Sequence, residues 1–307
     1  LLKIDDLGKI FKPPKTACVH TAPAFRTSPT FQDCHCQCPW NGQQTSIGKD
    51  RERVMKSGDR RDGIMDWMLQ LGTVTVDDLA ARFGVSKMTI HRDLDDLETA
   101  GFLRKIRGGA SVQSSSRFES DYRYRQKAAA EEKERIARAA AAMVEPGQTV
   151  IIDDGSTSGR VAAHLLDLKP LTVITNNLAV IDQLAAVPGI NLIALGGNYS
   201  RKFNGFFGLV TEEALKSLRA DIAFLTSSAI HGTAAFHQEQ AVVQTKRLMI
   251  AAAEHAYLLV DHGKFDKRAL HFLADLKAFS AVITGSPVGE DLGRHFAEAG
   301  VVLTVAG

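Results

Sequence analysis

The chain has 307 residues, of which 45% are hydrophobic, and a formal net charge of +2 at pH 7. This length allows two compact domains, and the hydrophobic share supports a sizeable core. No segment is long and apolar enough to cross a membrane, and no secretory leader is recognisable, so we expect no membrane partner. The near-neutral charge neither favours nor excludes nucleic acid, so the location of the charges matters more.

The first 54 residues differ in character from the rest. They are rich in Pro, Thr and Gln, and they hold all four cysteines, three of them in Cys34-His35-Cys36-Gln37-Cys38. This spacing is too tight to spread three thiolates around a zinc tetrahedron, so we predict no metal. We expect residues 1–54 to be a disordered or non-native leader, because Met55 stands just before the periodic region. The lack of cysteine elsewhere fits a reducing cytoplasm.

Residues 55–113 carry the boundary signals of three short helices. The segment from Thr75 resembles a capping box that opens the second helix, and Gly84 suits the tight turn of a helix-turn-helix unit. Ser86 then suits the N-cap of a third helix, which Gly101 stops. The apolar residues of this third helix recur at three- and four-residue spacing, so one face packs and the other is free.

A basic, strand-like tip follows the third helix and ends at Gly108-Gly109. Together, the helices and this tip have the layout of a winged helix-turn-helix DNA reader. Residues at the start of the third helix would face base edges, and the wing cations would contact phosphates. The residues that we expect to bind DNA are Ser86, Lys87, Thr89, His91, Arg92, Arg104, Lys105 and Arg107. The sequence leaves open that Arg92 instead pairs with Asp95 or Asp96.

The rest of the chain alternates helical and strand-like segments. We expect a linker over 114–130 and a larger domain over 131–300. The composition of 120–144 predicts one helix, and further helices are expected up to 168 and over 178–186. The predicted strands are 149–152, 171–175, 190–195, 222–225, 257–260 and 281–284. This alternation predicts a doubly wound α/β fold, in which ligands bind at the carboxyl ends of the strands.

Polar loops follow several of these predicted strands. In the glycine-rich loop at 153–159, small residues let the backbone approach a ligand, while hydroxyls and helix amides favour an anion. A plain tight turn is the alternative. Lys264 would add a point charge for a phosphate. The sequence therefore predicts a pocket for a small anion, formed by Asp153, Gly155, Ser156, Thr157, Ser158, Asn176, Gly197 and Lys264.

The stretch from Val85 to Ala110 resembles the N-terminal motif of the DeoR family of bacterial sugar-metabolism regulators. That motif reads V-[ST]-x-x-T-[IV]-R-R-D-L, then L-E-x-x-G and L-x-R-x-x-G-G-A. The chain departs from it at His91, where the family has the first arginine of the pair. Histidine cannot make the bidentate guanine contact of arginine, so we expect the operator sequence or its affinity to differ.

The larger domain resembles the effector domain of the same family, which is similar to sugar-phosphate isomerases. D-x-G-[ST]-[ST]-[ST] matches at 153–158, T-N at 175–176, L-G-G at 195–197 and D-x-x-K-F at 261–265. V-K-R-x-M-[IL] is approached at 245–250, and this resemblance adds Lys246 to the expected ligand site. The chain departs at Ala241 or Val242, where the family has an acid, and at 226–229, which lacks the usual glycines.

The resemblance implies a sequence-specific transcriptional repressor of a carbohydrate catabolic operon. Its partners would be operator DNA and a phosphorylated sugar, and it would work without a cofactor as a cytoplasmic homo-oligomer, since two half-sites need two readers. The alternative is a sugar-phosphate isomerase or deaminase with an accessory DNA domain. Its candidate groups would be Asp153, Asp154, His237, Glu239 and His262. We favour the regulator and assign no catalytic residue.

Overall fold

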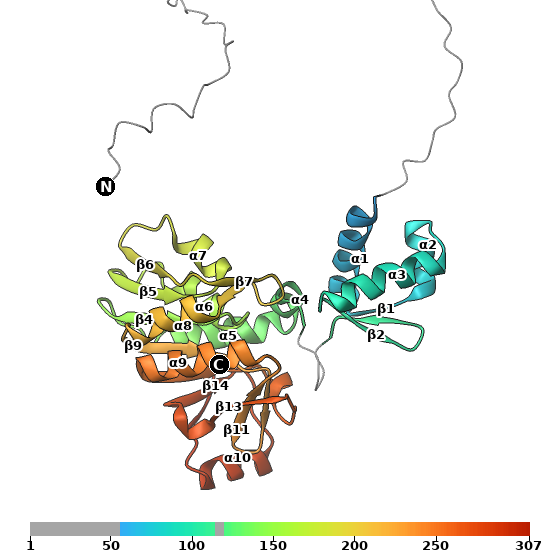
Figure 1. Ribbon diagram of the computed structural model, residues 1–307. Coiled ribbons are helices and arrows are strands. Elements are labelled where there is room, and N and C mark those ends of the chain that lie inside the picture. Colours follow the sequence, from blue (N-terminus) through green and yellow to red (C-terminus); the bar gives the residue numbers. More distant parts are fainter. Residues whose placement is uncertain (1–55, 114–119) are drawn as a thin grey trace, which may run out of the picture. The chain divides into compact units, whose positions relative to one another are not determined.

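The structure is a computed structural model that describes residues 56–113 and 120–307 (Figure 1). The expected leader and its Cys34–Cys38 run lie outside the described residues. Across the part of the chain that is described, no helix combines the length and the apolar character that a membrane span needs. In the same residues, no group of three or more His, Cys, Asp or Glu side chains could hold a metal ion.

The smaller domain packs three helices against a three-stranded antiparallel sheet. The helices are α1 (Ser57–Leu71), α2 (Val76–Phe83) and α3 (Lys87–Thr99), and the strands are β1 (Thr73–Thr75), β2 (Arg104–Ile106) and β3 (Gly109–Ser111). The strand order is β1-β3-β2. Ile64, Leu79 and Ile90 are fully buried at the centre of its core. The predicted winged helix-turn-helix fold is confirmed.

The signals that predicted the helix boundaries are present as hydrogen bonds. The side chain of Thr75 accepts from the backbone N–H of Asp78 at 3.1 Å. Ser86 Oγ accepts from the N–H of Thr89 at 3.2 Å. Gly84 has a φ of 63°, a left-handed conformation that favours glycine. The turn between α2 and α3 therefore follows from the sequence.

The larger domain is built on a seven-stranded parallel sheet in the order β15-β14-β12-β9-β4-β5-β6. These strands are β4 (Thr149–Ile152), β5 (Leu171–Thr175), β6 (Ile190–Ala194), β9 (Ala220–Leu225), β12 (Ala253–Leu259), β14 (Ala281–Thr284) and β15 (Leu303–Val305). The chain runs from β4 to one edge and then returns to β9 on the other side. The doubly wound α/β architecture is confirmed, and its topological switch point lies between β4 and β9.

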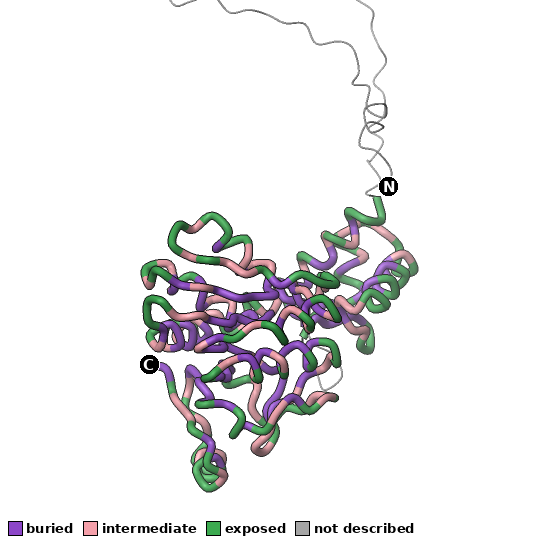
Figure 2. The backbone as a smooth tube through the Cα atoms, turned by 60° about the vertical axis from the view of Figure 1, so that its left-hand side comes forward, coloured by how far each residue is buried: buried purple, intermediate pink, exposed green. Residues whose placement is uncertain are grey.

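Helices cover both faces of this sheet. They are α4 (Tyr122–Lys127), α5 (Ala130–Ala141), α6 (Ser158–His164), α7 (Leu178–Leu184), α8 (Leu209–Lys216), α9 (Gln240–Ala252) and α10 (Glu290–Glu298). Helices α5, α6 and α7 share one hydrophobic core with the sheet, while α8, α9 and α10 share the other. Figure 2 shows many buried residues inside the larger domain, and the inner strands β4, β9 and β14 consist mainly of buried residues. Buried faces on both sides explain why the predicted strands are continuous apolar runs.

Short elements complete the larger domain. Strands β7 (Asn198–Ser200) and β8 (Gly205–Phe207) pair with each other, and β10 (Ala229–His231), β11 (Ala234–His237) and β13 (His271–Asp275) form a small antiparallel sheet. Two 3-10 helices are η2 (His262–Lys264) and η3 (Leu276–Ala278). These elements were not predicted, because they lack the apolar runs bounded by polar loops that marked the strands of the parallel sheet.

The prediction of one helix over 120–144 is wrong. The chain forms α4 and α5, and Ala129 between them has a φ of 51°, which ends regular helical hydrogen bonding. Composition favoured a continuous helix, but tertiary contacts override intrinsic propensity. In addition, α6 ends at His164 rather than at 168. Helix α4 lies inside the expected linker, and β15 lies beyond residue 300. The domain boundaries drawn from the sequence stay predictions.

Candidate functional site

Helix α3 presents a polar face to solvent. Lys87, His91 and Arg92 are exposed, whereas Ile90 and Leu94 are fully buried. The remaining two helix-start candidates are used in the cap itself, since the hydroxyls of Ser86 and Thr89 lie 3.0 Å apart. Helix α3 therefore has three exposed side chains that could contact DNA, while Ser86 and Thr89 cap its first turn.

Arg92 does not take the acidic partners that the sequence left open. Asp95 binds Lys105 at 2.5 Å, and Asp96 binds Arg61 at 2.5 Å. Among the described residues Arg92 forms no ion pair. Lys87 lies 2.7 Å from Asp77, and this pair, like that of Lys105, is solvent-accessible. Exposed pairs contribute about 1 kcal/mol or less, so both lysines can exchange a carboxylate for a phosphate.

The wing is a tight hairpin whose strands β2 and β3 pair Ile106 with Gly109. Arg107 is exposed in its turn, and Gly108 has a φ of 78°. A Cβ on Gly109 would lie 2.2 Å from the carbonyl oxygen of Val74, so only glycine allows β1 to pair this closely. Arg104 is half-buried. The smaller domain thus carries all eight predicted residues on α3, its cap and the wing.

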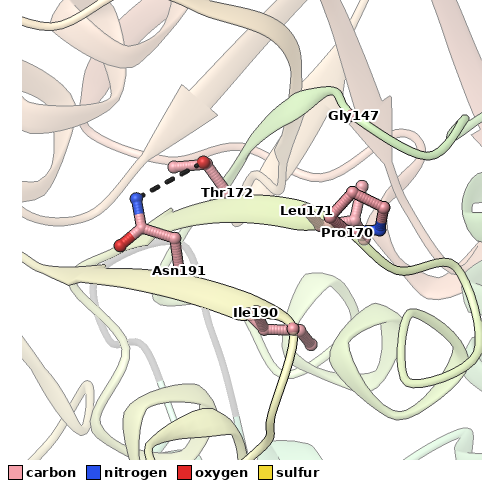
Figure 3. A pocket seen from close by; sticks show the side chains of 7 residues that line it. Gly147, Pro170, Leu171, Thr172, Ile190 and Asn191 are labelled. Carbon is pink, nitrogen blue, oxygen red and sulfur yellow. Dashed lines mark hydrogen bonds between the residues drawn. The ribbon is translucent and has the colours of Figure 1, made fainter.

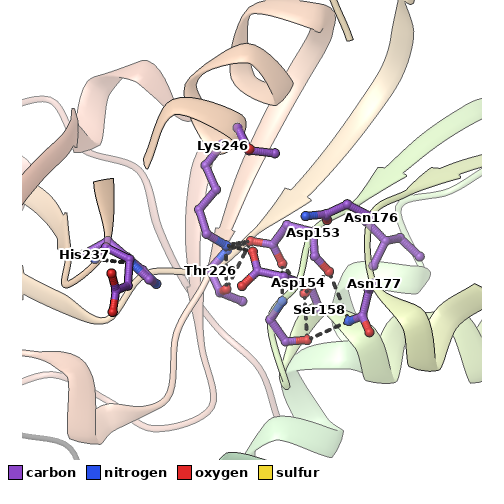
Figure 4. Close-up of polar contacts among 12 residues, drawn as sticks. Asp153, Asp154, Ser158, Asn176, Asn177, Thr226, His237 and Lys246 are labelled. Carbon is purple, nitrogen blue, oxygen red and sulfur yellow. Dashed lines mark hydrogen bonds and ion pairs between the residues drawn. The ribbon is translucent and has the colours of Figure 1, made fainter. Parts of the chain in front are cut away.

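In the larger domain, Asp153 is the centre of a buried network at the end of β4 (Figure 4). Its Oδ2 accepts from the backbone N–H of Thr226 at 2.7 Å and from the Thr226 hydroxyl at 3.0 Å. Its Oδ1 accepts from the N–H of Gly155 at 2.9 Å and from the hydroxyl of Ser158. Asp153 thereby ties the loop after β4 to the loop after β9, as a structural residue that orients both.

Lys246 on α9 completes this network. Its Nζ donates to Asp153 and lies 2.9 Å from Asp154 Oδ1, and its side chain is 1% exposed. Burial by itself would lower the pKa of Lys246, but the two aspartates more than offset this, so its pKa is raised. Burial raises the pKa of Asp154, although Lys246 opposes that effect. Lys246 is therefore a buried cation that holds the loops.

A pocket opens among the strand ends at the switch point. It encloses about 330 Å³ including adjoining solvent, but only about 20 Å³ can take the centre of a water molecule. A space that small holds about one water, so a larger ligand requires the lining side chains to move apart. The lining residues are Arg125, Ser156, Thr157, Thr226, Ser227, Ser228, His237, Leu259, Val260, Asp261 and Lys264.

Two hydroxyls in this pocket lack hydrogen-bond partners within the described residues. Ser227 Oγ and Ser228 Oγ are buried, and neither contacts a donor or an acceptor. A buried hydroxyl without a partner is costly, so these two serines indicate that a polar ligand group belongs beside them. They stand where the chain departs from the family's glycines.

The walls of the pocket carry more positive than negative charge. The lining residues include two cations, Arg125 and Lys264, and one carboxylate, that of Asp261. Glu132, on α5, holds the η2 segment that carries Lys264: its carboxylate accepts from the backbone N–H of His262 at 2.9 Å and contacts the ring Nδ1 at 2.5 Å. This contact raises the pKa of His262. The pocket is therefore an electropositive, polar site.

The structure divides the predicted ligand residues into two groups. Ser156, Thr157 and Lys264 line the pocket. The other six are absent from its lining: Asp153, Gly155, Ser158, Asn176, Gly197 and Lys246. A Cβ on Gly155 would lie 2.3 Å from Thr226 Oγ1, which makes glycine necessary there. Asn176 donates to the carbonyl of Phe206 at 2.9 Å.

Sequence reasoning missed several residues that line the pocket. Ser227 and Ser228 were noted only as a departure from the family pattern, and His237 only as an enzymatic candidate. Arg125 lies on α4, which composition had merged into a longer helix. Its place beside a strand end could not be read from periodicity, because α4 and the β4 loop meet only in the tertiary fold.

The groups considered for catalysis are not gathered in one place. Asp153 and Asp154 are buried against Lys246, and Glu239 contacts Lys202 Nζ at 3.1 Å. His262 binds Glu132 at the rim, and its side chain is 67% exposed. Of these five candidates, His237 alone lines the pocket.

A second, wider hollow lies at the opposite edge of the sheet (Figure 3). It encloses about 660 Å³ including adjoining solvent and is lined by Gly147 and by residues 170–172 and 189–191. These positions precede or begin β5 and β6, so this hollow lies at their amino ends. It has no charged lining residue. Topology and charge favour the switch-point pocket over this hollow.

Comparison with known proteins agrees with the two domains. Residues 60–116 match the DeoR-like helix-turn-helix domain, and residues 128–286 match the DeoR C terminal sensor domain. The glycerol-3-phosphate regulon repressor of Escherichia coli (strain K12) is 34% identical over 234 residues, which cover 76% of this chain and 92% of that protein.

Two further relatives match over similar shares. The L-fucose operon activator of Haemophilus influenzae is 30% identical, covering 80% of this chain and 98% of its own. The lactose phosphotransferase system repressor of Lactococcus lactis is 30% identical, covering 80% and 97%. Ribose 5-phosphate isomerase A of Methanocaldococcus jannaschii superposes with a TM-score of 0.32 at 18% identity, over 43% of this chain and 53% of its own. Because both domain models match and the relatives align along most of their length, the chain belongs to the DeoR family of transcriptional regulators.

Proposed function

We propose that this protein is a sequence-specific repressor of a carbohydrate catabolic operon and that a phosphorylated sugar controls it. The observation that carries the proposal is the switch-point pocket, in which the unpaired hydroxyls of Ser227 and Ser228 lie among cationic side chains. A phosphate group satisfies the cations, and sugar hydroxyls satisfy the serines. The names of relatives, which include a glycerol-3-phosphate regulon repressor, support this class of effector.

The DNA side of the proposal uses α3 and the wing. His91 and Arg92 are the exposed side chains that we assign to base edges, with Lys87, Arg104, Lys105 and Arg107 on phosphates. Two half-sites require two readers, so we assign a homo-oligomer. A regulator of this kind works in the bacterial cytoplasm, where the chromosome is.

We propose no enzymatic activity. An isomerase or deaminase needs a carboxylate or histidine that can move a proton at the sugar. Asp153 is instead held by five donors, and Asp154 lies beside the buried Lys246. The polar pocket therefore fits recognition of a sugar phosphate better than its turnover.

Arg92→Ala is expected to weaken operator binding by about 10- to 100-fold, because it removes a contact worth about 1–3 kcal/mol. Folding should be unchanged, since Arg92 is exposed and forms no ion pair with the described residues. The measurement is a gel-shift titration on DNA from the promoter of the neighbouring genes. Arg138→Ala, an exposed arginine on α5, is the matched control and should bind normally. Equal affinity of both variants and the wild type would contradict the placement of α3 in the groove.

A further inference from the structure

Lys133 is a buried cation immediately behind the pocket wall. It lies on α5, is 3% exposed, and was not among the residues predicted from the sequence. Its Nζ donates to the carbonyl oxygen of Arg125 at 2.5 Å and to Ser156 Oγ at 3.3 Å. Because Arg125 and Ser156 both line the pocket, Lys133 is connected to two of its walls without lining it.

The charge of Lys133 is only partly balanced in the protein alone. Its nearest carboxylate oxygen, Asp261 Oδ2, lies 4.0 Å away, which is too long for a hydrogen bond. Glu132, its neighbour on α5, is bound to His262. The largest of the other charge effects on Lys133 come from Lys264, Arg125 and Arg160, all of them cations. A buried cation in such surroundings is unfavourable until another negative charge approaches.

An anionic effector group in the pocket supplies that missing charge. We propose that Lys133 is a positioning residue that holds Ser156 toward the effector's phosphate and balances the charge of that phosphate from behind the wall. This inference rests on the proposed function. The role of Lys133 adds a source of selectivity to that function, because a neutral sugar of the same shape would leave the charge of Lys133 unbalanced.

The titration of Lys133 gives this arrangement a measurable pH dependence. Burial lowers the pKa of Lys133 to about 8. Asp261 opposes this shift, and the neighbouring cations add to it. A bound dianion favours the charged form and raises the pKa again. The complex therefore takes up a proton where free Lys133 is partly neutral, and affinity falls as the pH rises through about 8. The phosphate group of a monoester such as glycerol 3-phosphate loses its second proton near pH 6, so it contributes little there.

The test is isothermal titration calorimetry of the full chain with glycerol 3-phosphate. Inorganic phosphate, whose own second proton titrates within the pH range used, is a second probe of affinity alone. Titrations at pH 7 to 9, each in two buffers of different ionisation enthalpy, give the affinity and the protons taken up. The wild type should take up roughly half a proton per phosphate near pH 8. Lys133→Met should lose this uptake and bind about 10- to 100-fold more weakly.

Asp261→Asn is the second variant, and it decides the matter if Lys133→Met does not fold. Asparagine keeps an oxygen that can accept from the N–H of Gly263, as Asp261 does at 3.1 Å. Removing the carboxylate lowers the pKa of free Lys133 further, so proton uptake should grow at pH 7 to 7.5. Phosphate binding with unchanged affinity and uptake in Lys133→Met, or unchanged uptake in Asp261→Asn, would overturn the role of Lys133 and leave the proposed function standing. Failure of the wild type to bind either probe would overturn both.

Discussion

Replacing Asp153 with alanine is expected to destabilise the larger domain by about 3–5 kcal/mol. The change removes the carboxylate that accepts from Gly155 and Thr226 and that pairs with Lys246. Two buried backbone N–H groups would lose their acceptor, and Lys246 would keep only Asp154 as a counter-charge. Each of these losses is costly because water cannot reach the site to compensate.

Hydrogen–deuterium exchange of the peptides that contain β4 and β9 measures this effect, because it reports the free energy of opening of each segment. Asp154→Asn is the matched control. It removes the neighbouring carboxylate but leaves the contact of Lys246 with Asp153, so it should cost clearly less. If both variants exchanged at the same rate as the wild type, Asp153 would not join the loops.

Arg60→Met is expected to destabilise the smaller domain by a similar amount, about 3–5 kcal/mol. Arg60 on α1 makes two hydrogen bonds to Asp93 on α3, at 2.6 and 3.1 Å. The two side chains are 9% and 5% exposed. Removing the guanidinium leaves a buried carboxylate unpaired on α3.

Trp67, on α1, reports on this unfolding in urea once Trp40, the other tryptophan of the chain, is replaced by phenylalanine. The control is the double variant Arg60→Met with Asp93→Leu, which replaces the whole pair by apolar side chains. That variant should lie within about 1 kcal/mol of the wild type or above it. A single variant as stable as the double would show that the pair is not buried as described.

Local signals in the sequence were enough for the smaller domain. Thr75, Gly84 and Ser86 each act within three or four residues of their own position, so their consequences can be read from the chain alone. The absence of an ion pair at Arg92 among the described residues could not be read from the chain in this way. It depends on Lys105 and Arg61 taking the nearby aspartates, and such competition between distant side chains has no sequence pattern.

The larger domain shows the same division between local and tertiary information. Apolar runs predicted its strands, and their polar ends predicted where a ligand would bind. Periodicity could not show that Lys246 lies beneath the loops rather than in the pocket, since its contact with Asp153 spans 93 positions. The break at Ala129 was also hidden, because the surrounding alanine, glutamate and lysine favour an unbroken helix.

The most direct test of the central claim is fluorescence anisotropy of the full chain on its operator DNA, with small molecules added. Glycerol 3-phosphate, ribose 5-phosphate and glucose 6-phosphate are compared with glycerol, ribose and glucose. We predict that a phosphorylated compound changes operator affinity by about 5- to 150-fold, that its unphosphorylated counterpart does not, and that Lys264→Ala binds DNA but no longer responds. Operator affinity that stays the same with every phosphorylated compound, or their turnover by the protein, would contradict the account.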